Sequence, residues 1–406
     1  MVARHGHQKP SLKISFSLND ETHSFIKDNL SADLPALALR KAPENVDLSL
    51  ALRQIEAMQL LRKKVPEWAD NEQLLFPARV SIEQGSSEAT ARYKAQLLQG
   101  DTFADLTGGL GIDTYYLSQH FAKADYVEAN ADLCELARHN FNVLQAHIAV
   151  HNETAESFLA HCGTYDCLYL DPSRRDAHGR KTVAIADCAP DVADLQDLLL
   201  QKAHTVLIKL SPMLDISQAL NALRHVKEVH IVAVANECKE LVFRFERGFS
   251  GPTTLCCANL QTPQPEMRFT LDDERDCPLR LAETVGRYLY EPNAALLKAG
   301  CFRLPAQWFE VGKLHPSSHL YTSDTLVAGF PGRVFEVKGW AAYNKRVRNG
   351  LLAETEKANL AVRNFPMGTE ELRKSLKMSD GGEIYLFATT LRDGEKVLVK
   401  TKKAAP

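Results

Sequence analysis

The sequence predicts an α/β protein built on a doubly wound parallel sheet, and two observations support this. From residue 102 to residue 248, apolar runs typical of strands alternate with helical patterns, and the connections are short. Such alternation is typical of a parallel sheet with helices on both faces. In addition, a glycine-rich turn follows the first of these strands, as in sheets that hold a ligand at the carboxyl ends of their strands.

Composition and charge limit the class of protein. The 406 residues are 45% hydrophobic and 24% charged, as in a soluble globular protein, and the length predicts two to four domains. The net charge of -3 predicts no general attraction to nucleic acid, so any basic surface would be local.

The sequence shows no sign of a membrane or metal partner. No apolar run approaches the roughly 20 residues that span a bilayer, and the N-terminus has no apolar secretion segment. The nine cysteines are scattered without a CxxC pair, which favours reduced thiols over a disulfide or zinc framework. We therefore expect a cytoplasmic protein without a membrane partner and without a metal. The oligomeric state is left open.

Residues 1–84 are expected to form a mostly helical region, because Leu48, Leu52 and Ile55 follow helical spacing up to Pro66. The next domain should occupy residues 85–250.

A short helix should precede the first strand, since Ser86 and Ser87 stand before Glu88 as at a capped helix start. Alternatively, Ser86, Ser87 or Thr90 closes the top of a ligand pocket, and both interpretations can hold together.

The alternating region gives seven expected strands and five longer helices. The strands are expected at residues 102–106, 125–128, 148–150, 166–170, 205–210, 229–235 and 241–245, and the helices at 112–121, 133–145, 155–161, 192–203 and 216–223. Only residues 236–240 join the last two strands. This is too short for a crossover, so the sheet should end in an antiparallel hairpin.

The C-terminal part is expected to be α+β. Residues 251–285 contain four prolines and are interpreted as a linker together with the start of another unit. Beyond them we expect a helix at 288–299 and short strands around 309–311. The last unit, residues 331–406, should contain strands at 333–337 and 358–362, helices at 343–356 and 369–376, and a hairpin of 383–390 with 396–400.

The glycine turn does not have the spacing of a dinucleotide-binding fingerprint. It has the pattern G-G-x-G in place of G-x-G-x-x-G, and Asp105 stands three residues before its first glycine. The pattern resembles the first motif of class I S-adenosylmethionine (SAM) methyltransferases, and the terminal hairpin resembles their fold. The resemblance implies a Rossmann-like, seven-stranded methyltransferase sheet. An acid suits the cationic amino group of SAM, directly or through water, whereas it would repel a pyrophosphate.

Candidate donor-binding residues lie on this turn and on the strands beside it. Glu128 ends the second strand, where it could accept hydrogen bonds from both ribose hydroxyls or form a solvated strand end. Thr154 occupies the adenine-side position, where these methyltransferases often carry Asp. The cofactor-binding candidates are Ser86, Ser87, Thr90, Asp105, Thr107, Gly108, Gly109, Gly111, Asp113, Glu128 and Thr154.

The catalytic candidates are Asp171 and Pro172, which follow the fourth strand. Their position resembles the catalytic motif of amino-methylating relatives, in which Asp171 would orient or deprotonate the nucleophile and Pro172 would shape the site. Ser173 and Arg174 depart from that motif, and the missing aromatic weakens the case for methylation of a flipped purine. Neither the fourth nor the fifth strand ends in a cysteine nucleophile, which disfavours C5 methylation of pyrimidines.

Three basic residues near this motif are candidates for substrate contact. Arg174 and Arg175 could bind phosphate, or could pair with Asp176 or Asp187. Lys209, at the end of the fifth strand, could pair with Asp171 or line the cleft.

Several stretches together resemble a bacterial family of methyltransferases with ferredoxin-like and THUMP-like domains at the C-terminus. The matching stretches are residues 82–91, 105–111, 171–175, 208–215, 236–240, 363–366 and 380–382. The resemblance implies SAM binding, a ferredoxin-like domain within residues 251–330 after the linker, a THUMP-like domain at 331–406, and tRNA or rRNA as substrate.

The charge distribution of the C-terminal module agrees with an RNA partner. Residues 333–403 contain 15 Lys and Arg but 9 Asp and Glu, a local net charge of +6. Lys345, Arg346 and Arg348 cluster on one expected helix, and Arg373, Lys374 and Lys377 on another. The alternative is a solvated helix face. We therefore expect a SAM-dependent methyltransferase acting on structured RNA. The alternatives are a methyltransferase of a protein or small molecule, or an RNA-binding protein with a structural SAM site.

Overall fold

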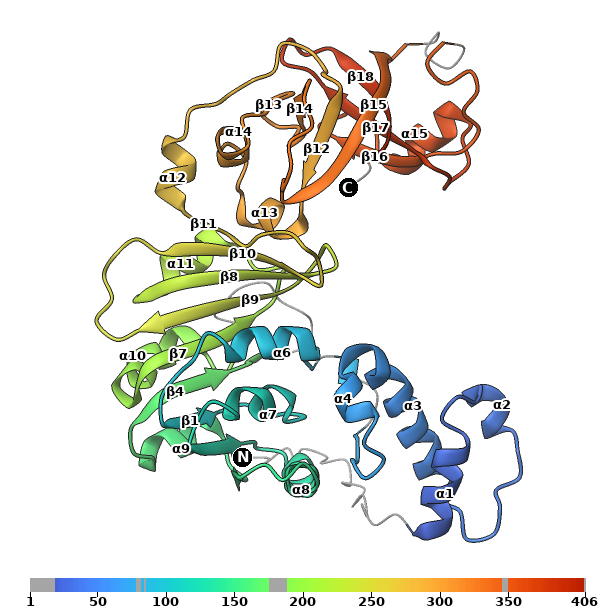
Figure 1. The fold of residues 1–406 in the computed structure, drawn as a ribbon. Coiled ribbons are helices and arrows are strands. Elements are labelled where there is room, and N and C mark those ends of the chain that lie inside the picture. Colours follow the sequence, from blue (N-terminus) through green and yellow to red (C-terminus); the bar gives the residue numbers. More distant parts are fainter. Residues whose placement is uncertain (1–18, 78–81, 84, 175–187, 345–349, 405–406) are drawn as a thin grey trace, which may run out of the picture. The chain divides into compact units, whose positions relative to one another are not determined.

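The computed structural model describes residues 19–77, 82–83, 85–174, 188–344 and 350–404 (Figure 1). The chain divides into two compact units. The first contains residues 1–210, 218–225 and 244–249, and the second contains residues 211–217, 226–243 and 250–406.

The N-terminal region of the first unit is helical, as predicted. Its helices are α1 (Asp20–Asp28), α2 (Leu34–Ala38), α3 (Leu48–Lys64) and α4 (Pro66–Ala69). Side chains of Asn19, Asp33 and Asp47 accept hydrogen bonds from backbone amides at the first three helix starts. Among the described residues, no helix combines the length and the apolar character needed to cross a membrane.

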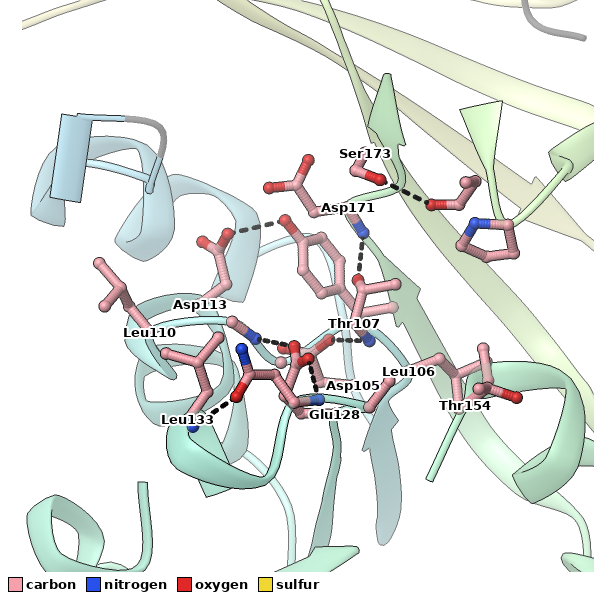
Figure 2. Close-up of a pocket in the computed structure, with 18 of the residues that line it drawn as sticks. Asp105, Leu106, Thr107, Leu110, Asp113, Glu128, Leu133, Thr154, Asp171 and Ser173 are labelled. Atoms are coloured by element: carbon pink, nitrogen blue, oxygen red, sulfur yellow. Dashed lines mark hydrogen bonds between the residues drawn. The ribbon is translucent and has the colours of Figure 1, made fainter. Parts of the chain in front are cut away.

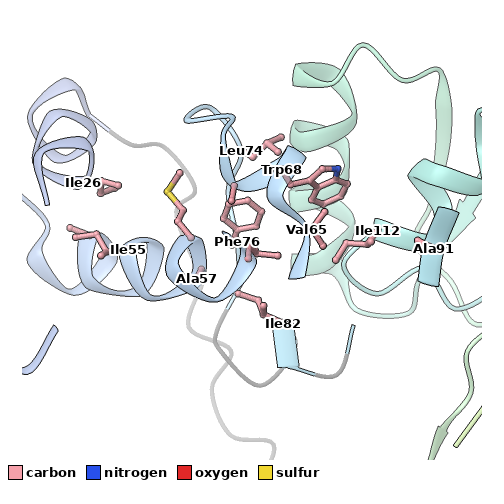
Figure 3. Close-up of a cluster of buried hydrophobic side chains, with 14 of the residues drawn as sticks. Ile26, Ile55, Ala57, Val65, Trp68, Leu74, Phe76, Ile82, Ala91 and Ile112 are labelled. Atoms are coloured by element: carbon pink, nitrogen blue, oxygen red, sulfur yellow. The ribbon is translucent and has the colours of Figure 1, made fainter. Parts of the chain in front are cut away.

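The helical region shares a hydrophobic core with the sheet domain of the same unit. Ile55 of α3 and Trp68 of α4 are buried in one cluster with Ile112 (Figure 3). The Trp68 ring also makes an edge contact with the Tyr115 ring, at 5.7 Å between centroids. Burial of these side chains attaches the helical region to the elements that follow the glycine turn.

The sheet domain has the predicted strand-helix alternation. Helix α6 (Glu88–Ala95) precedes the sheet, whose first strands are β1 (Thr102–Asp105), β2 (Lys123–Val127), β3 (Ile148–His151), β4 (Tyr165–Leu170) and β7 (Ala203–Leu210). The pairs β1–β2, β2–β3, β1–β4 and β4–β7 are all parallel. The intervening helices are α7 (Ile112–Ser118), α8 (Ala131–Val143), α9 (Ala155–His161) and α10 (Val192–Lys202), and α11 (Ile216–Ala222) follows β7. Separately, β5 (Ser173–Arg174) and β6 (Cys188–Ala189) form a small antiparallel ribbon. The predicted Rossmann-like fold is confirmed, with the carboxyl ends of β1, β2 and β4 at one edge.

The predicted hairpin is formed by β8 (Val226–Val234) and β9 (Glu237–Glu246), which are neighbours in the sheet. Its turn is tighter than predicted, because both strands are longer and only two residues join them. Ala235 and Asn236 have φ of 48° and 69°, as a type I′ turn requires.

The sheet has nine strands where seven were predicted. Its order is β11-β10-β8-β9-β7-β4-β1-β2-β3. The expected linker at 251–285 contains the two extra strands, β10 (Thr254–Leu260) and β11 (Met267–Thr270), and then α12 (Leu271–Asp276). Strand β10 pairs in parallel with β8 and its middle residues are buried, because it is a short apolar run; the prolines that suggested a linker lie outside it.

A second sheet has seven strands in the order β13-β14-β12-β15-β18-β17-β16. Its elements are β12 (Tyr288–Pro292), α13 (Ala294–Ala299), α14 (Leu304–Trp308), β13 (Gly312–Lys313), β14 (Tyr321–Ser323), β15 (Gly332–Ala342), β16 (Asn359–Arg363), α15 (Thr369–Leu376), β17 (Ile384–Thr390) and β18 (Lys396–Lys403). The expected hairpin is the antiparallel pair β17–β18. Successive side chains of a strand point to opposite faces of the sheet. The neighbours Leu398 and Val399 of β18 accordingly belong to two separate buried clusters.

Three expectations for this second sheet are wrong. The expected helix at 288–299 is strand β12 followed by α13, which begins after the Asn293 cap because an Asn side chain favours that position. Residues 309–311 lie between α14 and β13 and form no strand. In place of a helix at 343–356, β15 continues to Ala342 and residues 350–354 form a turn, while residues 345–349 lie outside the described part.

Candidate functional site

A cavity of about 540 Å³ lies at the carboxyl ends of β1, β2 and β4 (Figure 2). This volume falls within the roughly 300–1,000 Å³ typical of small-molecule sites. The predicted site residues that line the cavity are Ser86, Asp105, Thr107, Gly108, Gly109, Asp113, Glu128, Thr154 and Asp171. Eight of the eleven cofactor-binding candidates therefore meet, together with Asp171, at one edge of the sheet.

The glycine turn is packed directly against β2. A Cβ atom at Gly108 would lie 2.1 Å from the ring of Tyr126, so this position accepts only glycine without a shift of the ring. The Tyr126 hydroxyl donates to the carbonyl oxygen of Gly109 at 2.7 Å. Gly111 has φ of 78°, a conformation that favours glycine, and begins α7. The turn thus holds the backbone of Gly108 and Gly109 at the cavity wall.

Asp105 ends β1 and is 1% exposed. Its Oδ2 accepts a hydrogen bond from the Thr114 hydroxyl at 2.6 Å, and its Oδ1 accepts one from the amide of Thr107 at 3.0 Å. Burial raises the pKa of Asp105 to about 7, and the nearby charges of Asp113 and Asp171 act in the same direction, while the two hydrogen bonds oppose it. This carboxyl group changes charge near neutral pH.

Glu128 faces the same cavity from the end of β2. Its Oε2 accepts from the amide of Gly109 at 3.0 Å, and its Oε1 accepts from the amide of Asn130 at 2.8 Å (Figure 2). Thr154 lines the cavity and caps α9 by accepting from the amide of Ser157 at 3.2 Å. The Glu128 carboxylate is therefore fixed to the glycine turn. It is not simply a solvated end of a strand, which was the alternative interpretation.

Asp171 forms an ion pair with Lys209. The Nζ atom of Lys209, near the end of β7, lies 2.5 Å from Oδ2 of Asp171, as one of the two sequence interpretations predicted. The amide of Asp171 donates to the Thr107 hydroxyl at 2.6 Å, which joins the ends of β4 and β1. The Asp171 side chain remains 35% exposed, so it is accessible from the cavity.

A buried polar cluster around Asp113 forms part of the cavity wall. Hydroxyls of Ser86 and Tyr169 each donate to its Oδ2 at 2.7 Å, and Nζ of Lys94 lies 3.2 Å from its Oδ1. Burial raises the pKa of Asp113, but the charges of Lys94 and Lys209 and these hydrogen bonds outweigh it, so the pKa lies below its usual value. Asp113 is therefore a charged anchor within the site.

Two residues of the site, Lys94 and Tyr169, were not predicted from the sequence. Lys94 is 0% exposed, although lysine side chains are seldom buried. Lys94 lies one helical turn after the buried Ala91, on the same face of α6. That spacing was the available signal in the sequence. Tyr169 of β4, two residues before Asp171, lines the cavity, and its hydroxyl donates to Asp113.

The remaining predicted residues have other positions. Ser87 and Thr90 form a capping box at the start of α6 and are not among the lining residues, so the capping interpretation describes them. Pro172 is buried next to Asp171. Arg174 is the second residue of the short strand β5. The predicted substrate contacts Arg175, Lys345, Arg346 and Arg348 lie outside the described residues.

Comparison with known proteins identifies the family. Residues 288–331 match a ferredoxin-like domain and residues 332–403 match a THUMP domain-like family. A crystal structure of a candidate methyltransferase from Porphyromonas gingivalis W83 is 35% identical and covers 95% of this chain and 98% of its own, with a TM-score of 0.84. The chain belongs to the family of this methyltransferase, with ferredoxin-like and THUMP-like domains at the C-terminus. The fold, enzyme class and methyl donor expected from the motifs, a class I methyltransferase using SAM, are those of the family.

Other solved structures are more distant. TrmK of M. capricolum, in complex with S-adenosyl-homocysteine, is 13% identical and covers 39% of this chain and 68% of its own, with a TM-score of 0.30. The Escherichia coli protein yhhF, a candidate methyltransferase, is 21% identical over 39% of this chain and 84% of its own, with a TM-score of 0.29. These scores are too low to carry an argument about this chain. A search of curated proteins found no match.

Proposed function

We propose that this family member transfers the methyl group of SAM to a structured RNA, either tRNA or rRNA. The observation that supports this most is the convergence of the glycine turn, Glu128, Asp105 and Asp171 on one cavity in a chain that also carries a THUMP-like domain. The first three suit a cationic, ribose-bearing donor. Asp171, which lines the same cavity, would face the acceptor.

The chemistry of the cavity wall fits SAM. Gly108 and Gly109 line the cavity, and the close packing of Gly108 on the Tyr126 ring fixes the turn whose backbone would face the ligand. We assign the Glu128 carboxylate to the ribose hydroxyls and the Asp105 carboxylate to the cationic amino group. Thr154 and its neighbours on α9 would contact the adenine side.

When bound, SAM supplies a methyl group activated by the sulfonium. We assign to Asp171 the orientation of the attacking atom of the acceptor and the acceptance of the proton that it loses. The Lys209 ammonium, 2.5 Å away, would keep this carboxylate in place. The buried Pro172 would restrict the backbone beside it.

The C-terminal module would hold the RNA backbone. The described residues Lys374 and Lys403 are exposed there, and Trp340 is a partly exposed aromatic on β15 that could stack on a base. Arg373 is less available, because it pairs with Asp380 at 2.7 Å. Lys345, Arg346, Arg348, Arg174 and Arg175 stay proposed phosphate contacts on sequence grounds.

This proposal divides the work among the parts of the chain. Residues 85–250 would bind the donor and catalyse transfer, and residues 331–406 would bind RNA. Residues 1–84 would serve as a scaffold, β10 and β11 extend the sheet, and residues 288–331 match the ferredoxin-like domain.

Gel shifts with tRNA and calorimetry with SAM test the proposal together. Reversing the charge of Lys345, Arg346 and Arg348 to Glu should weaken RNA binding and flatten its salt dependence, because fewer counterions are released. The matched control reverses Arg40, Lys41 and Lys63, three exposed cations of the N-terminal region.

Three outcomes separate the candidates. Weaker RNA binding in the first variant alone supports the proposal. SAM binding without RNA binding would favour a protein or small-molecule acceptor, and RNA binding without heat from SAM would favour an RNA-binding protein without donor chemistry.

A further inference from the structure

Three metal-ligating side chains meet on neighbouring strands of the second unit, outside the methyl-donor cavity. Glu228 and His230 belong to β8, and Cys256 belongs to β10. The parallel register pairs Cys256 with His230, and Glu228 lies two residues earlier on the same face. Their ligand atoms all lie within 4.8 Å of one another.

The cluster is buried and its carboxylate is held in place. His230 and Cys256 are both 0% exposed. Oε2 of Glu228 lies 3.5 Å from Nε2 of His230, while Oε1 accepts a hydrogen bond from Arg268 at 3.0 Å. Arg268, opposite Cys256 on β11, also donates to Glu266 at 2.7 Å. Arg268 therefore binds one oxygen of the carboxylate and directs the other toward the histidine.

We propose that Glu228, His230 and Cys256 bind one Zn²⁺ ion. A thiolate, an imidazole nitrogen and a carboxylate oxygen are the donor types that zinc accepts in tetrahedral sites. Bonds of about 2.0–2.3 Å place tetrahedral ligand atoms roughly 3.3–3.8 Å apart. The separations here need only small side-chain adjustments to reach that range. A water molecule is the fourth ligand.

The ion would connect β8 with β10, the first of the two strands that the sequence analysis did not foresee. The ligands come from two segments about 26 residues apart in the chain, so they lack the short spacing by which zinc sites are found in sequences. Parallel pairing of β8 and β10 alone brings them together. The role of this ion is to stabilise the second unit, and it does not depend on the proposed methyl transfer.

Zinc and cobalt titration of the full-length protein tests the site, after dialysis against a chelator. The wild type should bind one equivalent of Zn²⁺, and Co²⁺ should give a thiolate charge-transfer absorption. Cys256→Ser should abolish that absorption and weaken zinc affinity at least a hundredfold. Cys257→Ser is the matched control, because Cys257 is the adjacent buried cysteine and pairs in register with Ile231 instead.

Glu228→Gln keeps the shape of the side chain and covers the case in which Cys256→Ser does not fold. It should lower zinc affinity at least tenfold while circular dichroism stays unchanged. Binding of less than one tenth of an equivalent by the wild type, or equal affinity in the Cys256 and Cys257 variants, would overturn the proposal. Heat from SAM binding is measured on the same samples, so loss of the zinc site and loss of the donor site are distinguished.

Discussion

The Nζ atom of Lys209 lies 2.5 Å from Oδ2 of Asp171, and the two residues come from neighbouring parallel strands. Strand β7 supplies the cation and the end of β4 supplies the carboxylate. The amide of Asp171 also donates to Thr107 of the glycine turn. The proposed catalytic group is thus tied on one side to a cation and on the other to the donor-binding turn.

Loss of the Asp171 carboxylate should slow methyl transfer without weakening SAM binding. Asp171→Asn removes the proton acceptor while it keeps the size of the side chain, so kcat should fall by roughly 10²–10⁴. Lys209→Met should lower kcat as well, and Lys209→Arg should restore part of it. Rates under saturating SAM, with calorimetry for donor affinity, measure both effects. A loss of SAM affinity equal to the loss of rate would instead place Asp171 in the donor site.

The glycine turn should tolerate no side chain at position 108. Gly108→Ala places a Cβ 2.1 Å from the Tyr126 ring. It should destabilise the fold by about 1–3 kcal/mol, as overpacking does, and abolish heat from SAM. Gly163→Ala is the control, because no atom lies within 4 Å of a Cβ at Gly163. Denaturant unfolding and calorimetry check this, and normal SAM binding by Gly108→Ala would contradict the assignment of the turn.

SAM binding should depend on pH through Asp105. Burial raises the pKa of this carboxyl group to about 7, so it is largely protonated at pH 6 and largely charged at pH 8. The cationic donor favours the charged form, so affinity should rise as pH rises through 7, and binding near pH 7 should release a proton to the buffer. Calorimetry in buffers of different ionisation enthalpy measures that release. Asp105→Asn should bind more weakly at pH 8 and show no proton release; a retained release would assign it to another group.

The Lys94–Asp113 pair should matter for stability far more than an exposed pair. Lys94→Met leaves the Asp113 carboxylate buried without its cation and should cost about 3–5 kcal/mol of unfolding free energy. Arg224→Ala removes an exposed partner of Asp197 and should cost at most about 1 kcal/mol. Urea unfolding of both variants makes the comparison. Equal losses would show that Lys94 does not compensate Asp113.

The sequence was sufficient to predict the parallel sheet and the ligand edge. Strand-helix periodicity is local, and the carboxyl ends of parallel strands necessarily share an edge, so Asp105, Glu128 and Asp171 could be placed together. The Lys209–Asp171 pair was foreseen for the same reason, since both residues stand at strand ends.

Features that depend on long-range pairing could not be predicted in the same way. Strand β10 was interpreted as a linker because its flanking prolines are visible in the sequence, whereas its pairing with β8 is not. The role of Lys94 depends on Asp113, which lies 19 residues further along the chain on a different helix. The expected helix at 288–299 was extended from the helical run 294–299 over residues 288–292, which form a strand because two antiparallel neighbours, β14 and β15, supply their hydrogen bonds.

Mass spectrometry of RNA nucleosides tests the central claim most directly. RNA from a deletion strain is incubated with purified protein and isotope-labelled SAM, using the wild type and Asp171→Asn side by side. We expect one methylated nucleoside that is absent from the deletion strain and gains the label only with the wild type. An unchanged nucleoside profile in the deletion strain, together with no label in tRNA or rRNA, would contradict RNA methylation by this protein.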